Sequence, residues 1–379
     1  MDIILILFFI GLVFSIIESN ISICAGTMIV PLLLLLNFNL LSSVGSSLLF
    51  TQFVALLNIS RYIKDYININ LGLLLSLIAV IGVFMGKIIE SFIINERMIY
   101  ILYVLLLSIF LFVTIYKRKI YFYYKNTPEY IKKLELYGYI YDKGAGIYYY
   151  PQNLKFGIPF EIFAGFSSVL LGGGAGLISN VNKTYIMKVP IKASIATSFL
   201  IILLTSTFSG ILYSNYIDIN IVFYLILGSI VGTIIGNYLM NKLNTKYIYS
   251  ILIFILSLLI SLLLSKIIGY HNIFLSVLIA LLISVLYVLI SKEEKYGAYK
   301  DLIINKPKFK FPLYIVIVEF LTLIVLYKFN IRFYNILYLF TFLFLIYLLF
   351  LSRRSNILYK IIISIILIML IFSIYNVLV

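Results

Sequence analysis

The sequence predicts an all-α polytopic membrane protein, in which two inverted repeats are followed by about four extra transmembrane helices. Each repeat is expected to hold a broken, re-entrant first element and three spans. Two observations predict this class: the composition, and short motifs that recur after about 150 residues. Of the 379 residues, 63% are hydrophobic and 11% are charged, and the mean hydropathy is +1.14. A soluble domain cannot bury so large an apolar fraction, so most of the chain is expected to lie in lipid.

Individual spans are visible as apolar runs. Residues 71–92, 99–116, 219–240 and 247–264 are each near the length that a helix needs to cross about 30 Å of hydrocarbon. The net charge of +15 would indicate a nucleic-acid partner in a soluble protein. Here the Lys and Arg residues lie in loops between apolar runs, so we expect no nucleic-acid partner and interpret them as topology signals.

The repeat shows itself in four pairs of short motifs that follow the same order in both halves. The pairs are CAG at 24–26 with GAG at 174–176, VGSS at 44–47 with IATS at 195–198, DYININ at 65–70 with NYIDIN at 215–220, and GVFMG at 82–86 with GTIIG at 232–236. Chance similarity between Ile- and Leu-rich segments explains one such match but not four in register. The sequence therefore predicts two copies of one transporter-like unit.

These copies divide the chain into four segments. Residues 1–116 form the first transmembrane repeat and residues 156–269 the second. Residues 117–155 form a basic, tyrosine-rich linker on the inner membrane surface. It could fold as a β-hairpin around its glycines, and the favoured alternative is an interfacial aromatic loop without a partner. Residues 270–379 form a C-terminal transmembrane extension of about four spans, in which no chemistry is indicated.

The distribution of Lys and Arg predicts the orientation of the repeats. If the first element of each half, 3–36 and 156–185, enters the membrane and returns to the same side, each half crosses three times. With both termini outside and the linker 117–155 in the cytoplasm, nearly all loop Lys and Arg residues are then inside. Full crossing by both first elements would divide these charges about evenly. An odd number of crossings per half inverts the second copy, as in many secondary transporters.

The first element of each half has a polar, glycine-containing middle, at 18–27 and at 170–182. Glycines let the backbone leave the helix, and in lipid the freed N–H and C=O groups need a ligand, water or neighbouring protein groups. The N-terminus of a half-helix presents unpaired N–H groups and the positive end of a dipole, which favours an anion.

The helices that follow each break add a stripe of polar side chains that could face one cavity. The stripes are Ser43, Ser47, Thr51 and Asn58 in the first half, and Ser194, Ser198, Thr205 and Ser209 in the second. The spacings keep each stripe on one helix face. The alternative for any single residue is a bond to a carbonyl of its own helix, which is common for Ser and Thr in membrane helices.

Several charged residues are weaker candidates. Glu18 lies beside the first break and is the best candidate among the acids for a coupling role, with interfacial placement as the alternative. Lys87 and Glu90 are three residues apart and can neutralise each other. Glu319 lies in an apolar run outside the duplicated unit, where it could contact the core or stabilise the extension.

These motifs resemble the sulfite exporter TauE/SafE family of membrane anion permeases over residues of about 1–269. The resemblance depends on AGTMIVP at 25–31, VPIKASIATS at 189–198, NYIDIN at 215–220 and GSIVGTIIG at 228–236, within a duplicated plan. It implies a secondary transporter, or permease, that moves sulfur-containing or small organic anions such as sulfite or sulfonates by alternating access. The chain departs from the family pattern in three places. These are SICAG at 22–26, where a fuller glycine run is usual; VGSS at 44–47, where Thr-Ser would match; and Val181 and Asn182, where a Pro would match.

The resemblance and the repeat together indicate a substrate-binding set. Its members are Gly26, Thr27, Ser46 and Ser47 in the first half, with Pro31 close by, and Gly174, Gly176, Thr197 and Ser198 in the second. Glu18 is added as the coupling candidate.

Other functional classes fit the sequence less well. The chain has one His and one Cys and lacks the motifs of hydrolases and metalloproteases, so we expect no enzyme, metal or cofactor. A passive anion channel and a membrane scaffold or assembly protein are the alternatives. The expected partners are a small anionic substrate and the lipid bilayer; a homo-oligomer stays open.

Overall fold

The structure is a computed structural model that describes residues 3–22, 25–62, 66–90, 96–115, 127–142, 145–242, 245–268, 273–290 and 364. It confirms an all-α polytopic membrane protein. Among the described residues, seven helices are long and apolar enough to cross a membrane, and these are α1, α3, α4, α7, α9, α10 and α11. Glu319 and all but α12 and residue 364 of the predicted extension lie outside the described residues.

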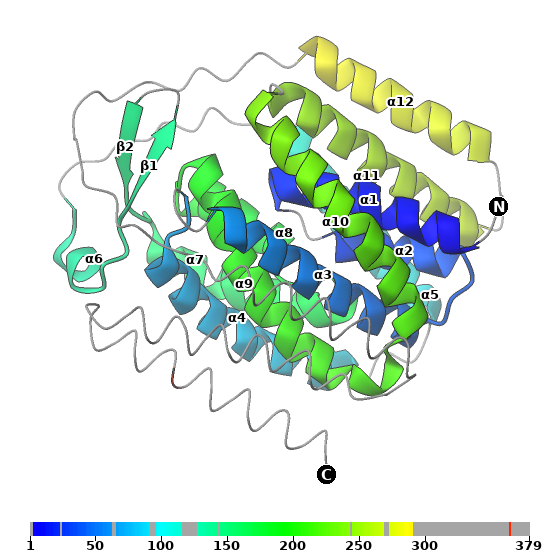
Figure 1. Cartoon of the computed structure of the whole chain (residues 1–379), viewed down its shortest axis with the longest axis horizontal. Helices are drawn as coiled ribbons and strands as arrows, with labels where there is room; N and C mark the ends of the chain where they lie inside the picture. Colours follow the sequence, from blue (N-terminus) through cyan, green and yellow to red (C-terminus); the bar gives the residue numbers. More distant parts are fainter. Residues whose placement is uncertain are drawn as a thin grey trace.

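Both halves contain the same elements in the same order (Figure 1). The first half consists of α1 (Ile3–Ile21), α2 (Gly26–Leu35), α3 (Leu40–Tyr62), α4 (Ile69–Glu90) and α5 (Glu96–Ile115). The second consists of α7 (Leu154–Leu171), α8 (Gly176–Val181) with the π-helix η1 (Asn182–Ile186), α9 (Ile191–Leu212), η2 (Ser214–Tyr216), α10 (Ile219–Lys242) and α11 (Thr245–Ile268). Between them lie α6 (Glu129–Lys133), β1 (Gly138–Asp142) and β2 (Ala145–Tyr149), and α12 (Ile273–Ile290) follows.

The central helices α3 and α9 run in opposite directions through the middle of the molecule (Figure 1). Near the start of α3, the hydroxyl of Ser46 accepts a hydrogen bond from the N–H of Asp218, which follows α9 (3.0 Å). Near the start of α9, the hydroxyl of Thr197 accepts a hydrogen bond from the N–H of Asn68, which follows α3 (3.1 Å). Asn68 and Asp218 occupy equivalent positions of DYININ and NYIDIN, so each repeated turn is held by the other half.

The first element of each half is a hairpin that returns to the side from which it starts. In the second half, the N–H of Gln152, just before α7, donates to the carbonyl of Met187, just after η1 (2.8 Å). In the first half, the beginning of α1 packs beside the beginning of α10, and the chain returns through α2 to start α3 at that same end of the bundle. If α3, α4 and α5 cross in the first half and α9, α10 and α11 in the second, each half crosses three times; the number of crossings stays a prediction.

Glycines hold two pairs of helices in close contact, and the two pairs obey the repeat. In α10, Gly232 and Gly236 face the backbone of Leu12 and Ile16 in α1; in α4, Gly82 and Gly86 face the backbone of Ile162 and Phe166 in α7. Every one of these partners is displaced by the same 150 residues from its counterpart. Because each pair joins one helix from each half, the halves interlock. Small residues four positions apart in a span are typical of close helix packing, and these glycines serve that role.

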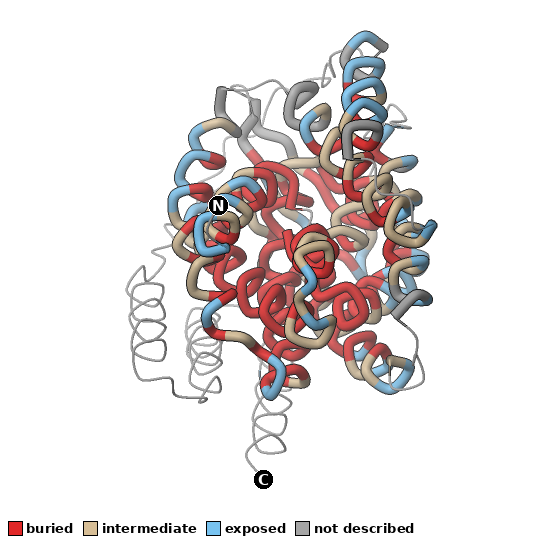
Figure 2. Tube along the Cα trace, turned by 90° about the vertical axis from the view of Figure 1, so that its right-hand side faces the viewer, coloured by how far each residue is buried: buried red, intermediate tan, exposed pale blue. Residues whose placement is uncertain are grey.

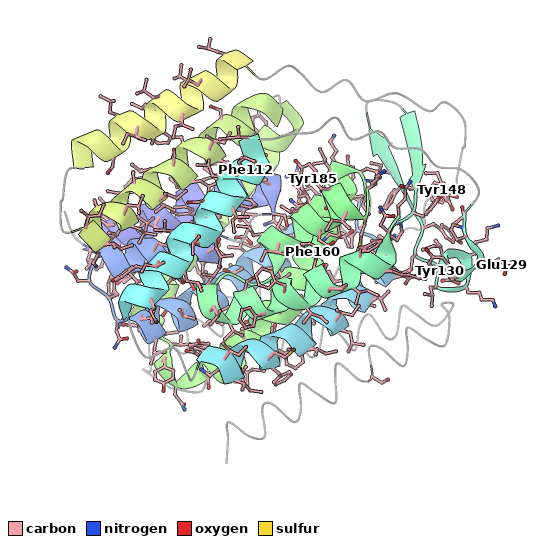
Figure 3. All side chains as sticks on the ribbon, turned by 180° about the vertical axis from the view of Figure 1, so that it is seen from behind. Phe112, Glu129, Tyr130, Tyr148, Phe160 and Tyr185 are labelled. Carbon is pink, nitrogen blue, oxygen red and sulfur yellow. The ribbon has the colours of Figure 1, made fainter. Side chains whose placement is uncertain are left out.

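The exposed surface of the bundle is apolar, as contact with lipid requires. Figure 2 shows the buried residues concentrated at the centre of the bundle, with exposed residues around its outside. Phe112 on α5 and Phe160 on α7 are 64% and 50% exposed (Figure 3). Glu129, Tyr130 and Tyr148 lie together beyond one end of the bundle, on the linker (Figure 3).

The linker forms the β-hairpin that its glycines suggested, and it packs against the first repeated turn. β1 and β2 are antiparallel, with Gly138 opposite Tyr149. The amide of Asn68 donates to the carbonyl of Leu136 (3.0 Å), and burial raises the pKa of Tyr149 above its ordinary value. We call the end of the bundle that carries residues 127–150 the linker face, and the other end the opposite face.

The glycine contacts lead to a test of helix packing. We expect Gly82→Ala and Gly232→Ala to destabilise the protein by about 1–3 kcal/mol each, because a Cβ at either position overlaps a backbone carbonyl that cannot rotate away. Gly45→Ala is the matched control, since the nearest atoms to its Cβ lie at 3.3 Å. The measurement is the thermal midpoint of the detergent-purified protein. Equal midpoints for all three variants would contradict the packing account.

Candidate functional site

Both hairpins break where the sequence predicts. The helix α1 ends at Ile21, and Ser22 takes a positive φ of 55° before α2 begins at Gly26. The helix α7 ends at Leu171, and Gly172 and Gly174 take φ values of 62° and 67° before α8 begins at Gly176. Gly172 and Gly174 stand in a backbone region that other residues rarely adopt.

The two breaks meet inside the molecule. A Cβ at Gly26 would overlap the carbonyl oxygen of Gly172, and a Cβ at Gly173 would overlap Thr27. The hydroxyl of Ser47 on α3 donates to the carbonyl of Gly172 (2.6 Å), so α3 of the first half stabilises the break in the second half. The structure thus brings together three residues predicted from the first half, Gly26, Thr27 and Ser47, at the glycine run of the second.

Backbone groups freed at the breaks are satisfied by side chains, but the two halves use different chemistry. The N–H of Ala25 donates to a carboxylate oxygen of Glu18 (3.1 Å). The N–H of Ala175, the equivalent position, donates to the hydroxyl of Thr205 (3.1 Å). At the end of α1, the carbonyl of Ile21 accepts from the side-chain amide of Asn180 on α8 (2.8 Å).

Glu18 is buried, with 1% of its surface exposed. The protein therefore encloses this carboxyl group, and its depth in the membrane stays a prediction. One carboxylate oxygen holds the Ala25 N–H next to the start of α2, and the other, Oε1, has no hydrogen-bond partner among the described atoms. The positive end of the α2 dipole lies beside this carboxyl group, and an anion would bind at that same end.

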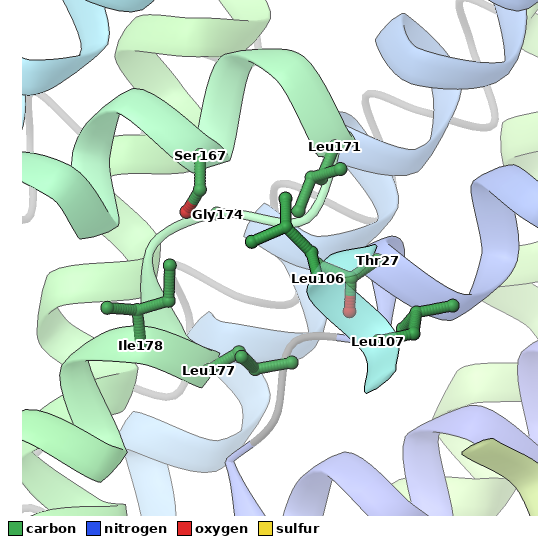
Figure 4. A pocket seen from close by; sticks show the side chains of 8 residues that line it. All are labelled: Thr27, Leu106, Leu107, Ser167, Leu171, Gly174, Leu177 and Ile178. Atoms are coloured by element: carbon green, nitrogen blue, oxygen red, sulfur yellow. The ribbon is translucent and has the colours of Figure 1, made fainter. Parts of the chain in front are cut away.

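A small cavity lies beside the breaks (Figure 4). Thr27, Ser167 and Gly174 supply its polar groups, and Leu106 and Leu107 of α5 form part of its apolar wall, together with Leu171, Leu177 and Ile178. The cavity has a volume of about 10 Å³, which is space for about one water molecule. The two halves therefore close tightly around the breaks.

The remaining predicted residues do not line this cavity. Ser46 and Thr197 hold the repeated turns at opposite ends of the bundle. Ser198 bonds the carbonyl of Ser194 in its own helix (2.9 Å). Gly176 is the first residue of α8, directly after the break, and Pro31 lies buried inside α2. Their assignment to the substrate stays a prediction.

Some side chains of the two polar stripes reach the breaks, and others bond carbonyls of their own helix. Thr51, Asn58, Ser198 and Thr205 each bond a carbonyl four residues earlier in their own helix. Ser47 and Thr205 also reach the breaks, and Ser209 contacts Ser168 on α7. Two residues of the stripes therefore position the breaks, and the local alternative holds for most of the others.

Charged residues lie outside the breaks in two places. Lys87 and Glu90 form an ion pair at 2.6 Å, as their spacing predicts. Lys183, counted with the inner loops in the orientation argument, is instead fully buried, because η1 continues the hairpin past the end of α8 and keeps this side chain inside. Glu161 on α7 is also fully buried.

Sequence reasoning missed Ser167, Asn180 and the charged pair of Glu161 and Lys183. Ser167 could have been found from its place shortly before the glycine run, in the last turns of α7. Glu161 sits in an apolar run much as Glu18 does, which was a usable signal. Asn180 gave none, because its partner is the carbonyl of a residue 159 positions away. Among the described residues, no group of three or more His, Cys, Asp and Glu could hold a metal ion.

Comparison with known proteins agrees with this duplicated, broken-helix architecture. The model of the sulfite exporter TauE/SafE family matches residues 7–264, a range that spans both repeats and leaves α12 outside. No curated protein and no solved structure matches the chain. A match over more than half of the chain assigns it to a family of multi-pass membrane transporters, and the protein belongs to the sulfite exporter TauE/SafE family.

Proposed function

We propose that the protein is a permease that moves sulfite or another small sulfur-containing or organic anion across the cell membrane by alternating access. The observation that carries this proposal is the meeting of the two breaks, where Gly26 and Thr27 touch Gly172 and Gly173. Backbone at such a place is close enough to a ligand to replace part of its hydration shell, and the cavity beside it offers hydroxyls without a full positive charge.

The proposed binding position is the cavity of Thr27, Ser167 and Gly174, enlarged in the states that open to either side. In the closed state described here the cavity has space for about one water. A small oxyanion therefore requires separation of the helices around it. Such separation distinguishes a transporter from a channel, in which a continuous path stays open.

Flux in proteoliposomes tests the proposal. The panel contains sulfite, sulfate, thiosulfate, sulfoacetate, taurine and chloride, with empty liposomes as the background. We expect saturable flux of a sulfur-containing anion by the native protein. Flux that rises without saturation would favour the channel. Background flux of every anion from folded, inserted protein would contradict the proposal and favour a scaffold role.

Removing the hydroxyls that line the cavity tests the proposed binding position directly. We expect the double variant Thr27→Val, Ser167→Ala to raise the half-saturating anion concentration by about a hundredfold or more, because it removes two hydrogen bonds to a charged group, each worth about 1.5–3 kcal/mol. Thr114→Val is the matched control, since this buried hydroxyl bonds only Phe110 of its own helix (2.7 Å) in the described contacts. An unchanged half-saturation in the double variant would place the anion elsewhere.

We further propose that Glu18 is a coupling residue, because its carboxylate and the transported anion compete for the start of α2. Glu18→Gln keeps an oxygen for the Ala25 N–H and removes the charge. We expect the half-saturating concentration to fall by about tenfold, which corresponds to about 1.4 kcal/mol of like-charge repulsion. Glu129→Gln, in the linker, is the control. An unchanged or higher value would rule out the competition.

We propose that the linker face is cytoplasmic and that the opposite face lies outside. In a Cys24→Ser background, Asn215→Cys reports the opposite face and Tyr139→Cys the linker face, and both positions are exposed. A membrane-impermeant maleimide should label Asn215→Cys in intact cells and Tyr139→Cys only after lysis. The reverse pattern would invert the orientation.

A further inference from the structure

Two fully buried charges, Glu161 and Lys183, lie where α7 and η1 run side by side. Ionisable side chains at membrane depth are costly and usually serve a function. The pair belongs to the second half alone: the position equivalent to Glu161 is Gly11, which packs against the carbonyl of Leu225. A role in the shared framework of the repeats therefore does not explain it.

Two residues connect these charges. The side-chain amide of Asn182 donates both to Oε2 of Glu161 (2.8 Å) and to the carbonyl of Gly157 (2.8 Å). The ammonium of Lys183 donates to the hydroxyl of Ser179 (2.6 Å), and Ser179 also hydrogen-bonds the carboxyl group of Glu161. The carboxylate and the ammonium are thus joined through one hydroxyl.

The cluster of Glu161, Asn182, Ser179 and Lys183 can accept one more proton. Oε1 of Glu161 and Oδ1 of Asn182 are buried acceptors without a hydrogen-bond partner among the described atoms. Leaving such acceptors unsatisfied is costly, and a proton on the carboxyl group would turn one acceptor into a donor. The local backbone is also unusual, since π-helical turns such as η1 occur frequently at functional sites.

Lys183 supplies the charge that acts directly on Glu161. The other ionisable groups that the structure describes on α7 and on the helices packed against it have different surroundings. Lys155 is exposed at the start of α7, and Tyr185 is half-buried on η1. Lys87 and Glu90 are paired on α4, Lys192 of α9 lies over the Tyr66 ring, and Arg61 lies over the Tyr62 ring. The hydroxyls of Tyr62 and Tyr213 are hydrogen-bonded to Ser19 and Val169.

The pair is also placed on a path from the cavity. Leu177 and Ile178 of α8 line the cavity, and Lys183 follows Gly176 by seven residues, which is about 10 Å of helix toward the linker face. The helix α8 therefore connects the cavity to the buried pair. While Glu161 is charged, it offsets the ammonium, and the attraction of Lys183 for an anion is weak.

We propose that Glu161 is a proton-binding site and that its protonation frees Lys183 to bind the transported anion, so that a proton and an anion move together. This inference rests on the proposed function and names its coupling ion. A proton from the aqueous phase binds the Glu161 carboxylate, the anion then pairs with the Lys183 ammonium, and loss of the proton restores the internal pair and expels the anion. The proton leaves on the side where the anion is released.

The test is the pH dependence of flux in proteoliposomes, with sulfate and thiosulfate as probes because their charge is constant around neutral pH. We expect native flux, measured below saturation, to rise on acidification by up to about tenfold per pH unit, as one titrating group allows. A pH dye trapped in the vesicles should report proton movement that depends on the anion. Native flux without either effect would overturn the inference.

Variants separate a coupling role from a structural one. Glu161→Gln mimics the protonated side chain and should transport at a rate that no longer depends on pH, without proton movement. Lys183→Met alone leaves a buried carboxylate without its counter-charge and can fail to fold. The double variant Glu161→Gln, Lys183→Met removes both charges and should fold but lose most of the flux.

The double variant Glu90→Gln, Lys87→Met removes an ion pair on α4 and is the matched control, which should retain the native pH profile. A Glu161→Gln protein that keeps the native pH profile, or a folded Glu161→Gln, Lys183→Met protein with native flux, would overturn the inference and leave the proposed function intact. Absence of flux for the whole anion panel at every pH would instead overturn the proposed function.

Discussion

A backbone group that leaves a helix inside a bilayer must find its partner within the protein, and the rest of this structure depends on that constraint. Four groups at the two breaks show how it is met. Ser47 and Asn180 bond carbonyls of the opposite half, while Glu18 and Thr205 bond N–H groups of their own half. Because two of these bonds cross between the halves, neither break is satisfied unless both halves are folded together.

The repeats share a framework but not their polar chemistry. The contacts of Gly232 and Gly236 with α1 correspond to those of Gly82 and Gly86 with α7, and the turns held by Ser46 and Thr197 also correspond. At equivalent N–H groups, however, a carboxylate stands in one half and a hydroxyl in the other. Packing geometry constrains both copies equally, whereas an ion needs only one set of polar groups, so the polar positions are free to differ.

Close packing also defines which parts can move as units. Each glycine-lined pair combines one helix of the first half with one of the second, and a backbone-to-backbone contact of this kind resists sliding. In an alternating-access cycle, the moving bodies would therefore combine α1 with α10 and α4 with α7, around the antiparallel pair of α3 and α9. The cavity at the breaks is lined by residues of α2, α5, α7 and α8.

The sequence by itself determined the membrane class, the duplication, the positions of both breaks and the close-packing glycines, because composition and local spacing control each of these. It also indicated Gly26, Thr27, Ser47 and Gly174, which the structure brings together at the breaks, since glycine runs mark where a helix must end. Only the tertiary structure decided that Ser46 and Thr197 hold the turns, that Ser167 joins the cavity and that Lys183 is buried beside Glu161. Those outcomes depend on partners more than 100 residues away or on the path of the hairpin, and local sequence patterns carry no record of either.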